Sequence, residues 1–144
     1  MSDVTEYVTD VLHEETQVHE GGVDLSLGEV YVVDEPGRVD FGGGELEDPE
    51  LEEHPTRKRN PDDDYAWWNL ESGTYLMEYN EGLEPGDADL RLQTRRELLE
   101  RGASHPSLVL RPETYDGLPR MCFTVSEGGI RIKENARVST VSLE

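Results

Sequence analysis

Five arginines gather within one segment of a strongly acidic chain, and their type and spacing point to anion binding. They lie between Thr94 and Met121, at Arg95, Arg96, Arg101, Arg111 and Arg120. Guanidinium groups donate paired hydrogen bonds to phosphate or carboxylate oxygens, so such a cluster can hold an anionic ligand. The alternative is that the arginines only neutralise neighbouring carboxylates, as Glu100 could do for Arg96 across one helical turn.

The segment that positions these arginines reads as a short helix followed by an extended run. The string RRELLERG predicts one short internal helix that stops at Gly102, because glycine commonly terminates helices. Leu98 and Leu99 stand three and four residues after Arg95, so the stem of Arg95 could equally cover apolar surface. The string SLVLR then predicts a strand, and YDGL predicts a turn.

Most of the remaining chain has β character. Residues 21–41 predict two strands, because apolar residues alternate up to Leu27, Gly28 interrupts them, and a β-branched run follows. The long run from Tyr65 to Gln93, and then RMCFTV, GIRIKE and ARVSTVSL, predict a series of short strands. Apolar residues at helical spacing after Ser2 predict a short N-terminal helix. This pattern predicts an all-β barrel or jelly-roll sandwich.

Residues 42–64 are rich in glycine, proline and charge. We expect a long acidic loop there, because no periodic apolar pattern crosses it. Neither part of the chain on its two sides has a large core of its own. We therefore expect a single domain over residues 1–144, in which residues 42–64 are an insertion.

The charge balance excludes some classes of partner. The 144 residues include 33 Asp and Glu against 13 Lys and Arg, which gives a formal net charge of −20. Such a surface is typical of proteins that work at high salt, where ions screen the repulsion, so we expect a halophilic source. Phosphates of nucleic acids would be repelled, and we expect no nucleic-acid partner. Two Trp and six Tyr favour a folded chain over a disordered one.

Cysteine content and hydropathy limit which covalent links, metal sites and cellular compartment we expect. Cys122 is the only cysteine, so an intrachain disulfide is excluded, and within MCFTV we expect it to be a buried structural thiol. The histidines show no metal-binding spacing, and no metal site held by the protein is predicted. No apolar run approaches the roughly 18 residues of a membrane span. Because no signal peptide is visible either, we expect a cytoplasmic protein without membrane contact.

Several segments, taken in order, resemble the trimeric dUTPase and dCTP deaminase superfamily. GGVDLSLGEVY resembles its first conserved segment, SGTYLMEYNEGLEPGD its middle strands, RRELLERG its phosphate-binding motif, YDGL its element after the catalytic hairpin, and GGIRIKENARVSTV its closing strands. The layout and the Pro-Gly-Arg turn look closest to the haloarchaeal dUTPase-like branch. The resemblance covers nearly the whole chain apart from the acidic loop.

The resemblance implies a dUTPase-like β jelly roll that assembles as a homotrimer, with active sites at subunit interfaces. In that family a triphosphate lies on the short helix and its cations, usually with Mg²⁺ bridging the phosphate oxygens. The dUTPases hydrolyse dUTP to dUMP and pyrophosphate through a water activated by an Asp. The dCTP deaminases act on the pyrimidine ring through a Glu, without zinc. The implied role is therefore in deoxynucleotide metabolism.

Position by position, the resemblance implies a set of binding residues. They are Arg95, Arg96 and Gly102 for phosphate, Tyr115 and Gly117 for the nucleoside, and Asp24 for the fold or the metal region. Arg96 replaces a serine of the motif but can still donate to phosphate. Read from the residues alone, Asp24 could instead be a turn or cap carboxylate, and Tyr115 could be a core aromatic.

The catalytic residues of the family are not matched, so we assign none. The dUTPase Asp falls on Pro112, which has no acid–base chemistry, and the deaminase Glu falls near Cys122. Glu113 could replace the missing carboxylate only with a shift of register, which in a strand would turn its side chain to the other face. Asp116 lies just beyond the expected hairpin. The alternative function is a catalytically inactive homologue that binds a nucleotide or a protein.

Overall fold

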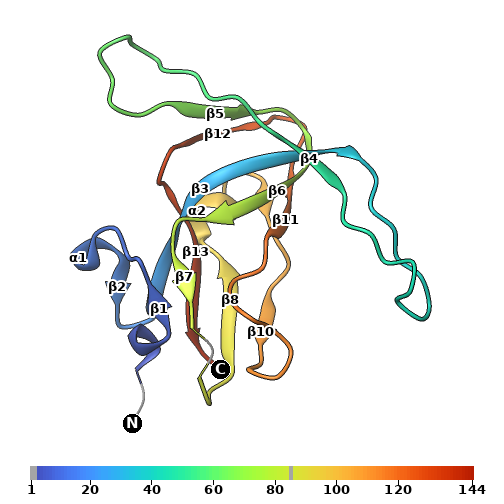
Figure 1. Ribbon diagram of the computed structural model, residues 1–144. Helices are drawn as coiled ribbons and strands as arrows, with labels where there is room; N and C mark the ends of the chain where they lie inside the picture. The colour runs from blue at the N-terminus through green and yellow to red at the C-terminus, as the bar shows by residue number, and fades with distance from the viewer. Residues whose placement is uncertain (1–2, 85) are drawn as a thin grey trace.

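The computed structural model describes residues 3–84 and 86–144, and these residues form a mostly β fold (Figure 1). The strands are β1 (Val8–Thr9), β2 (Val18–His19), β3 (Gly22–Glu35), β4 (Glu50–Glu53), β5 (Trp67–Leu70), β6 (Gly73–Tyr79), β7 (Gly82–Leu83), β8 (Leu90–Thr94), β9 (Ala103–Ser104), β10 (Leu108–Leu110), β11 (Met121–Val125), β12 (Ile130–Lys133) and β13 (Arg137–Leu143). The helices are the 3-10 turn η1 (Val4–Glu6), α1 (Glu14–Gln17) and α2 (Arg96–Leu99). The expected all-β class, with a short N-terminal helix and a short internal helix, is confirmed.

One curved sheet of nine strands carries most of the fold. Its main order is β10-β8-β13-β3-β6-β11-β9, and β2 and β4 also pair with β3. Two further pairs, β1-β7 and β12-β5, form small sheets of their own. Figure 1 shows the β12-β5 pair lying along one end of the large sheet, beside β3 and β4. In the part of the chain that the structure describes, the helices are too short and too polar to span a membrane.

The core lies along β3 and the strands beside it. Val23, Leu25, Leu27 and Val30 of β3 have no exposed surface. Since side chains of a strand alternate between its faces, a strand with one buried face needs an apolar residue at every second position. The neighbouring strand β6 follows this rule, whereas β13 has an irregularity near its start and buries Val138 and Val141. The inward residues of these strands belong to one contiguous apolar cluster.

Strand β11 shows both the strength and the limit of that rule. Met121, Phe123 and Val125 are buried, whereas Cys122 and Thr124 between them are exposed. The prediction of a buried Cys122 thiol is therefore wrong. The strand was predicted correctly. Because Met121, Phe123 and Val125 face the core, the side chain of Cys122 between them faces outward.

Strand β3 is one continuous strand of 14 residues, where the sequence predicts two. Gly28 does not end it. The pairing with β6 is instead irregular between Leu27 and Glu29. A Cβ atom at Gly28 would lie 2.6 Å from Asn80 Oδ1, so glycine allows the two chain segments to approach there.

Two predicted segments differ in detail from the structure. The N-terminal helix is shorter than its apolar spacing predicts: η1 leads into β1, and α1 begins only at Glu14 (Ser2 lies outside the described residues). The segment 42–64, for which the sequence predicts a loop, contains β4, which pairs with β3. Figure 1 shows the residues between β3 and β4 extending away from the large sheet.

Phe123 and Thr124 provide a direct measure of the core on one strand. Phe123 is 1% exposed, and we expect Phe123→Ala to lower the free energy of unfolding by about 3–5 kcal/mol through lost burial and a cavity. Thr124→Ala on the outward face should change it by less than about 0.5 kcal/mol. Urea unfolding of the two variants measures both values, and equal losses would contradict the burial pattern described here.

Candidate functional site

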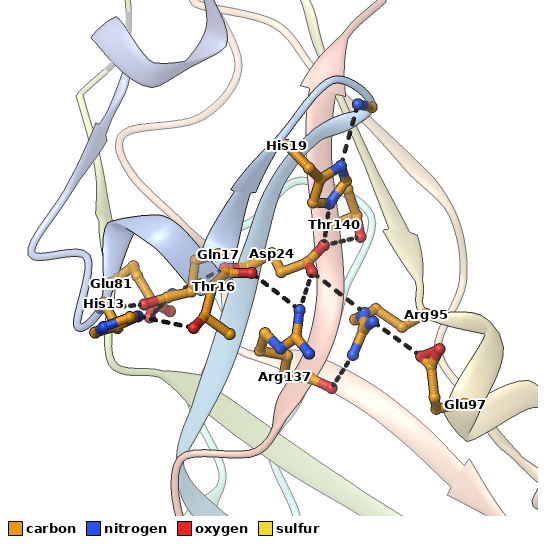
Figure 2. A network of polar contacts seen from close by, with 11 residues as sticks. His13, Thr16, Gln17, His19, Asp24, Glu81, Arg95, Glu97, Arg137 and Thr140 are labelled. Atoms are coloured by element: carbon orange, nitrogen blue, oxygen red, sulfur yellow. Dashed lines mark hydrogen bonds and ion pairs between the residues drawn. The ribbon is translucent and has the colours of Figure 1, made fainter.

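A buried carboxylate stands at the centre of a polar network on the large sheet (Figure 2). Asp24 lies on β3 and is 1% exposed. Its Oδ1 accepts a hydrogen bond from Thr140 Oγ1 at 2.7 Å and lies 2.8 Å from His19 Nε2. Its Oδ2 accepts from Arg137 Nη1 at 2.9 Å and lies 3.5 Å from Arg95 Nε. Both oxygens therefore have polar partners, as a buried charge requires.

Sheet pairing brings these partners together, although they are far apart in the sequence. β13 lies between β3 and β8, and Thr140 stands opposite Asp24 in the β13–β3 register. Arg95 directly follows β8, and its backbone N–H donates to Val138 O of β13 at 3.0 Å. His19 comes from β2, which pairs with the start of β3. The site is thus assembled from four strands and not from one local motif.

The environment of Asp24 keeps it charged. Burial alone would raise the pKa of Asp24, but the hydrogen bonds from His19 and Thr140 and the positive charge of Arg95 outweigh this effect. The pKa of Asp24 consequently lies below its ordinary value of 3.8. A carboxylate held in its charged form in this way is a poor general base at neutral pH. Its role is to position the cations around it.

Arg95 and Arg137 keep hydrogen-bonding capacity beyond their contacts with Asp24. Arg95 Nη2 lies 3.0 Å from Glu97 Oε2, and Arg137 Nη1 also donates to Thr16 O at 3.0 Å. Arg95 Nη1 also donates to Arg137 O at 3.4 Å. A guanidinium has five N–H donors, so these contacts saturate neither cation. The side chains of Arg95 and Arg137 are 19% and 34% exposed. Together they can bind an anion that approaches from solvent, a phosphate group among them.

A second buried carboxylate fixes the chain next to Asp24. Gln17 of α1 donates from Nε2 to the backbone oxygen of Asp24 at 2.9 Å and to Glu81 Oε2 at 2.8 Å. Glu81 also accepts from the backbone N–H of Ser26 at 2.8 Å and from its hydroxyl. Gln17 and Glu81 are 3% and 5% exposed. Gln17 therefore couples the short helix α1 to the strand that carries Asp24.

The other two residues predicted to bind phosphate lie on α2 and just after it. Arg96 is the first residue of α2 and is exposed, without an ion pair among the residues that the structure describes. Gly102 follows α2 with a φ of +85°, and a Cβ atom there would collide with Ser126 Oγ. This geometry explains glycine at position 102 through the backbone alone.

The residues predicted to bind the nucleoside lie at the other end of β8. Tyr115 is half-buried and lines a small cavity together with Leu90, the first residue of β8. Arg95 follows the last residue of this five-residue strand, and the strand itself spans about 13 Å. Gly117, near Tyr115, has a φ of +99°, which suits the predicted turn. Tyr115 and Arg95 therefore do not meet within one chain.

The hairpin implied between β10 and β11 is not formed in the described part of the chain. β10 pairs with β8, β11 pairs with β6 and β9, and residues 111–120 form turns and bends. Pro112, at the position of the dUTPase carboxylate, is partly buried, whereas Glu113 and Asp116 are exposed. Since this segment is not a strand, the objection that a shifted Glu113 would face the wrong side of a strand does not apply.

The donor set does not fit a magnesium ion held by the protein. Among residues 3–84 and 86–144, no group of three or more His, Cys, Asp or Glu side chains is placed to hold a metal ion. Asp24, the carboxylate predicted for the metal region, already shares its oxygens among four donors. Mg²⁺ usually binds through one or two carboxylates together with substrate phosphates. Here the positive charges beside Asp24 are those of Arg95 and Arg137, in the position that a metal ion would otherwise occupy.

A buried hydrogen-bonded chain adjoins the Asp24 network and was not predicted from the sequence. His105 Nε2 and Tyr79 Oη each lie 2.7 Å from Ser139 Oγ, and His105 Nδ1 lies 2.8 Å from Pro106 O. The carbonyl of Pro106 can only accept, so His105 carries its proton on Nδ1 and accepts from Ser139 through Nε2. Burial lowers the pKa of His105 below its ordinary value of 6.5. The histidine is therefore neutral in this chain of hydrogen bonds.

Sequence reasoning singled out Asp24 and Arg95, which the structure places in one polar network, but it did not single out His19, Arg137 or Thr140 as their partners. The Ala-Arg pair before the last strand was noted only as part of a resemblance. The sequence did contain a signal for Arg137 and Thr140. Polar residues recur at every second or third position of the last strand, between apolar ones, which indicates side chains that face away from the core. The partner of such a residue depends on which strand lies beside it, which the pattern does not contain.

Comparison with known proteins finds related sequences and solved structures of similar fold. A probable deoxyuridine 5'-triphosphate nucleotidohydrolase of Archaeoglobus fulgidus is 30% identical over 132 residues, which cover 91% of this chain and 74% of that protein. A protein of the same name from Methanosarcina acetivorans is 28% identical over 125 residues, covering 86% of this chain and 70% of that protein. No model of a known protein family matches the chain.

The solved structure is that of 2'-deoxycytidine 5'-triphosphate deaminase from Agrobacterium tumefaciens. It superposes with a TM-score of 0.56 at 16% identity, over 96% of this chain. The superposed part is 43% of the deaminase chain, so this chain spans less than half of its length. At this identity the likeness shows a common fold, and that fold includes the strands that assemble the Asp24 network.

Asp24 provides the first test of this network. We expect Asp24→Asn to lower the free energy of unfolding at pH 7 by about 3 kcal/mol, because two arginines then lose their buried counter-charge. The folded pKa of Asp24 lies below 3.8, so the contribution of this carboxylate is complete above pH 3.8 and is lost as the pH falls further. Denaturant unfolding across this pH range should show the difference between the two proteins narrowing in acid. Asp34→Asn, at an exposed position of β3, is the matched control and should have little effect.

His105 provides a second test with a different pH range. Its folded pKa lies below 6.5, so its contribution to stability is complete above pH 6.5 and is lost as the pH falls below that value. Protonation would also break the hydrogen bond from Ser139 to Nε2. We expect the free energy of unfolding to decrease on acidification, and His105→Gln to weaken this pH dependence. His13→Gln, at an exposed residue, should preserve it, and an unchanged pH dependence in His105→Gln would contradict the assignment.

Proposed function

The chain belongs to the dUTPase and dCTP deaminase superfamily, and we propose that it binds a pyrimidine deoxynucleoside triphosphate and hydrolyses dUTP to dUMP and pyrophosphate. One observation carries the proposal: the buried carboxylate of Asp24 contacts both Arg95 and Arg137, and the side chain of each arginine is partly exposed. Arg95 is the residue that the family resemblance assigns to phosphate. The curated relatives named as probable dUTP nucleotidohydrolases favour dUTP over dCTP.

The two arginines would act on the charge of the triphosphate. In the reaction a water attacks the α-phosphorus, the bond to the oxygen that bridges the α- and β-phosphates breaks, and pyrophosphate leaves. Arg95 and Arg137 would bind phosphate oxygens and neutralise the charge that grows on the leaving group. The rigid β3–β13–β8 pairing fixes both cations before the substrate arrives, which favours this role.

The base that takes the proton from water is not Asp24, since its surroundings hold it in the charged form. Glu113 and Asp116 are the exposed carboxylates of the segment that follows β10. Because this segment and Arg95 lie at opposite ends of β8, one site would combine Arg95 of one copy with the Tyr115 segment of another. We propose a homotrimer, as in the family, in which Tyr115 and Gly117 bind the nucleoside from a neighbouring copy.

Magnesium would have to arrive with the substrate. The described residues form no metal-binding group of their own, so Mg²⁺ would be carried by the phosphate oxygens of the nucleotide. We further propose that residues 1–144 act as one dUTPase-like domain in the cytoplasm, with residues 42–64 as an insertion. The net charge of −20 supports a protein that works at high salt.

The alternative function is a nucleotide-binding homologue without catalytic activity. The sequence favours it: by the resemblance, the dUTPase carboxylate falls on Pro112 and the deaminase carboxylate falls near Cys122 or on Thr124, and none of these residues is a carboxylate. In this alternative the Asp24 network would bind the triphosphate and release it unchanged. Only an assay for turnover separates the two functions.

The assay follows pyrophosphate release from dUTP and ammonia release from dCTP, with Mg²⁺ at high salt. We expect turnover of dUTP, and a loss of about 100-fold in kcat/KM in Arg95→Gln, because a donor to the transition state is removed. Arg95→Lys keeps the positive charge beside Asp24, so it tests the contribution of the guanidinium to kcat/KM with less effect on folding. Arg91→Gln, at an exposed arginine paired with Glu144, is the matched control and should retain activity.

The other outcomes assign the alternative or reject both functions. A dUTP-dependent rise in melting temperature without turnover, lost in Arg95→Gln, would identify the inactive nucleotide-binding homologue. If the protein deaminates dCTP and does not hydrolyse dUTP, it would instead be assigned to the dCTP deaminase branch of the superfamily. If the protein shows no turnover and no thermal shift with any deoxynucleotide, this result would contradict the proposed function and its alternative.

A further inference from the structure

The outer face of the small β12–β5 sheet carries cations and aromatic rings and lies outside the Asp24 network. In the register of this pair, Lys133 stands opposite Trp67, and Arg131 stands opposite Asn69. Strand alternation turns Trp68 and Ile132 inward, where they are 1% and 4% exposed, and leaves the other four side chains on the outer face. No carboxylate occupies these four outward positions, although the chain contains 33 Asp and Glu.

A third strand-like segment adds to this face. Arg57 forms an isolated backbone bridge with Trp67, and Arg59 follows two residues later. The Arg59 Cζ lies 5.7 Å from the centroid of the Trp67 ring, and Lys133 Nζ lies 5.8 Å from it. Lys133 Nζ is also 6.0 Å from the centroid of the Tyr65 ring. Cation–π contacts therefore hold two cations beside Trp67.

Three cations of this face have no anionic partner. In the part of the chain that the structure describes, Arg59, Arg131 and Lys133 form no ion pair. Elsewhere on the surface, Arg38, Arg91 and Arg120 each pair with a glutamate. Other exposed arginines, Arg96 among them, are also unpaired in the described residues, so this face is distinguished by three such cations close together with no carboxylate at its four outward positions. The unpaired cations are available to an anion from outside the chain.

The same face is hollowed. A surface cavity of about 530 Å³ is lined by Arg59, Trp67, Asn69 and Arg131. It adjoins a second one of about 890 Å³, since Asn69 and Arg131 line both. The first volume lies within the range of roughly 300–1,000 Å³ that is typical of small-ligand sites. None of the side chains that contact Asp24 lines either cavity.

We propose that this cation–aromatic groove, formed by Arg59, Trp67, Asn69, Arg131 and Lys133, is a second binding site, and that its ligand is a nucleoside phosphate. The phosphate groups bind the guanidinium of Arg131 and the ends of Arg59 and Lys133. The base lies against the indole of Trp67, a contact that every nucleobase can make because each has a π-face. Asn69 offers both an amide donor and an acceptor to the edge of the base or to the sugar.

The groove also has a direction. The 890 Å³ cavity continues past Arg131 to Arg101, Glu71 and Glu127, and the two carboxylates repel phosphate but can accept hydrogen bonds from sugar hydroxyls. The phosphates therefore occupy the 530 Å³ part, which Arg59 and Arg131 line and no carboxylate lines. A short nucleotide fits this arrangement, whereas a long polynucleotide would have to pass the acidic surface around it.

The test is a titration of the full chain with AMP, at fixed ionic strength, followed by tryptophan fluorescence and by calorimetry. We expect AMP to quench fluorescence saturably, and Trp67→Phe to abolish this change. Arg131→Gln and Arg59→Gln should each weaken AMP binding by about tenfold. Arg91→Gln, at an exposed arginine on β8, is the matched control and should leave AMP binding unchanged.

Three outcomes would overturn the proposal. The first is an absence of saturable quenching by AMP, and the second is an equal loss in Arg91→Gln and Arg131→Gln. The third is binding of adenosine or of inorganic phosphate as tight as that of AMP, because the groove would then not recognise both parts of the ligand. Arg95→Gln should leave the AMP titration unchanged. If it abolished the titration instead, AMP would be binding at the Asp24 network and the groove would not be the site.

Discussion

A carboxylate buried in a β-sheet must be surrounded by hydrogen-bond donors or cations, because an unpaired charge in the interior is strongly unfavourable. In this protein the carboxylate is Asp24, and its need for partners fixes Arg95 and Arg137 where β8, β13 and β3 lie side by side. The same contacts that stabilise the charge prepare two cations for an anion. Stability and the proposed ligand binding therefore depend on one set of interactions.

The distribution of charge gives the protein two different cationic regions. At the Asp24 network the arginines are held by carboxylates and by strand pairing, so their positions are rigid. At the outer face of the β12–β5 sheet the cations rest on aromatic rings and have no carboxylate partner among the described residues. In a chain with a net charge of −20, each local positive region must be separated from the acidic surface by packing. At the Asp24 network the paired strands β3, β13 and β8 provide this packing. At the outer face of the β12–β5 sheet the rings of Trp67 and Tyr65 provide it.

The separation of Arg95 from Tyr115 determines how the family resemblance can apply to this chain. The motifs for phosphate and for nucleoside are both present in the sequence, but β8 lies between them. In the function proposed above, a complete site therefore combines residues of more than one copy, as the resemblance implies for subunit-interface sites. The irregular segment 111–120 keeps Glu113 and Asp116 accessible for such a contact.

The sequence by itself determined the β class, most of the strands and the internal helix, because periodicity is a local property of the chain. The order of its motifs indicated the family and singled out Asp24 and Arg95 as candidate site residues. Only the tertiary structure decided that β3 is continuous, that Cys122 is exposed, and that His19, Arg137 and Thr140 surround Asp24. The reason is physical: the partners of a strand residue are set by which strands lie beside it and in which register, and that pairing joins residues more than one hundred positions apart.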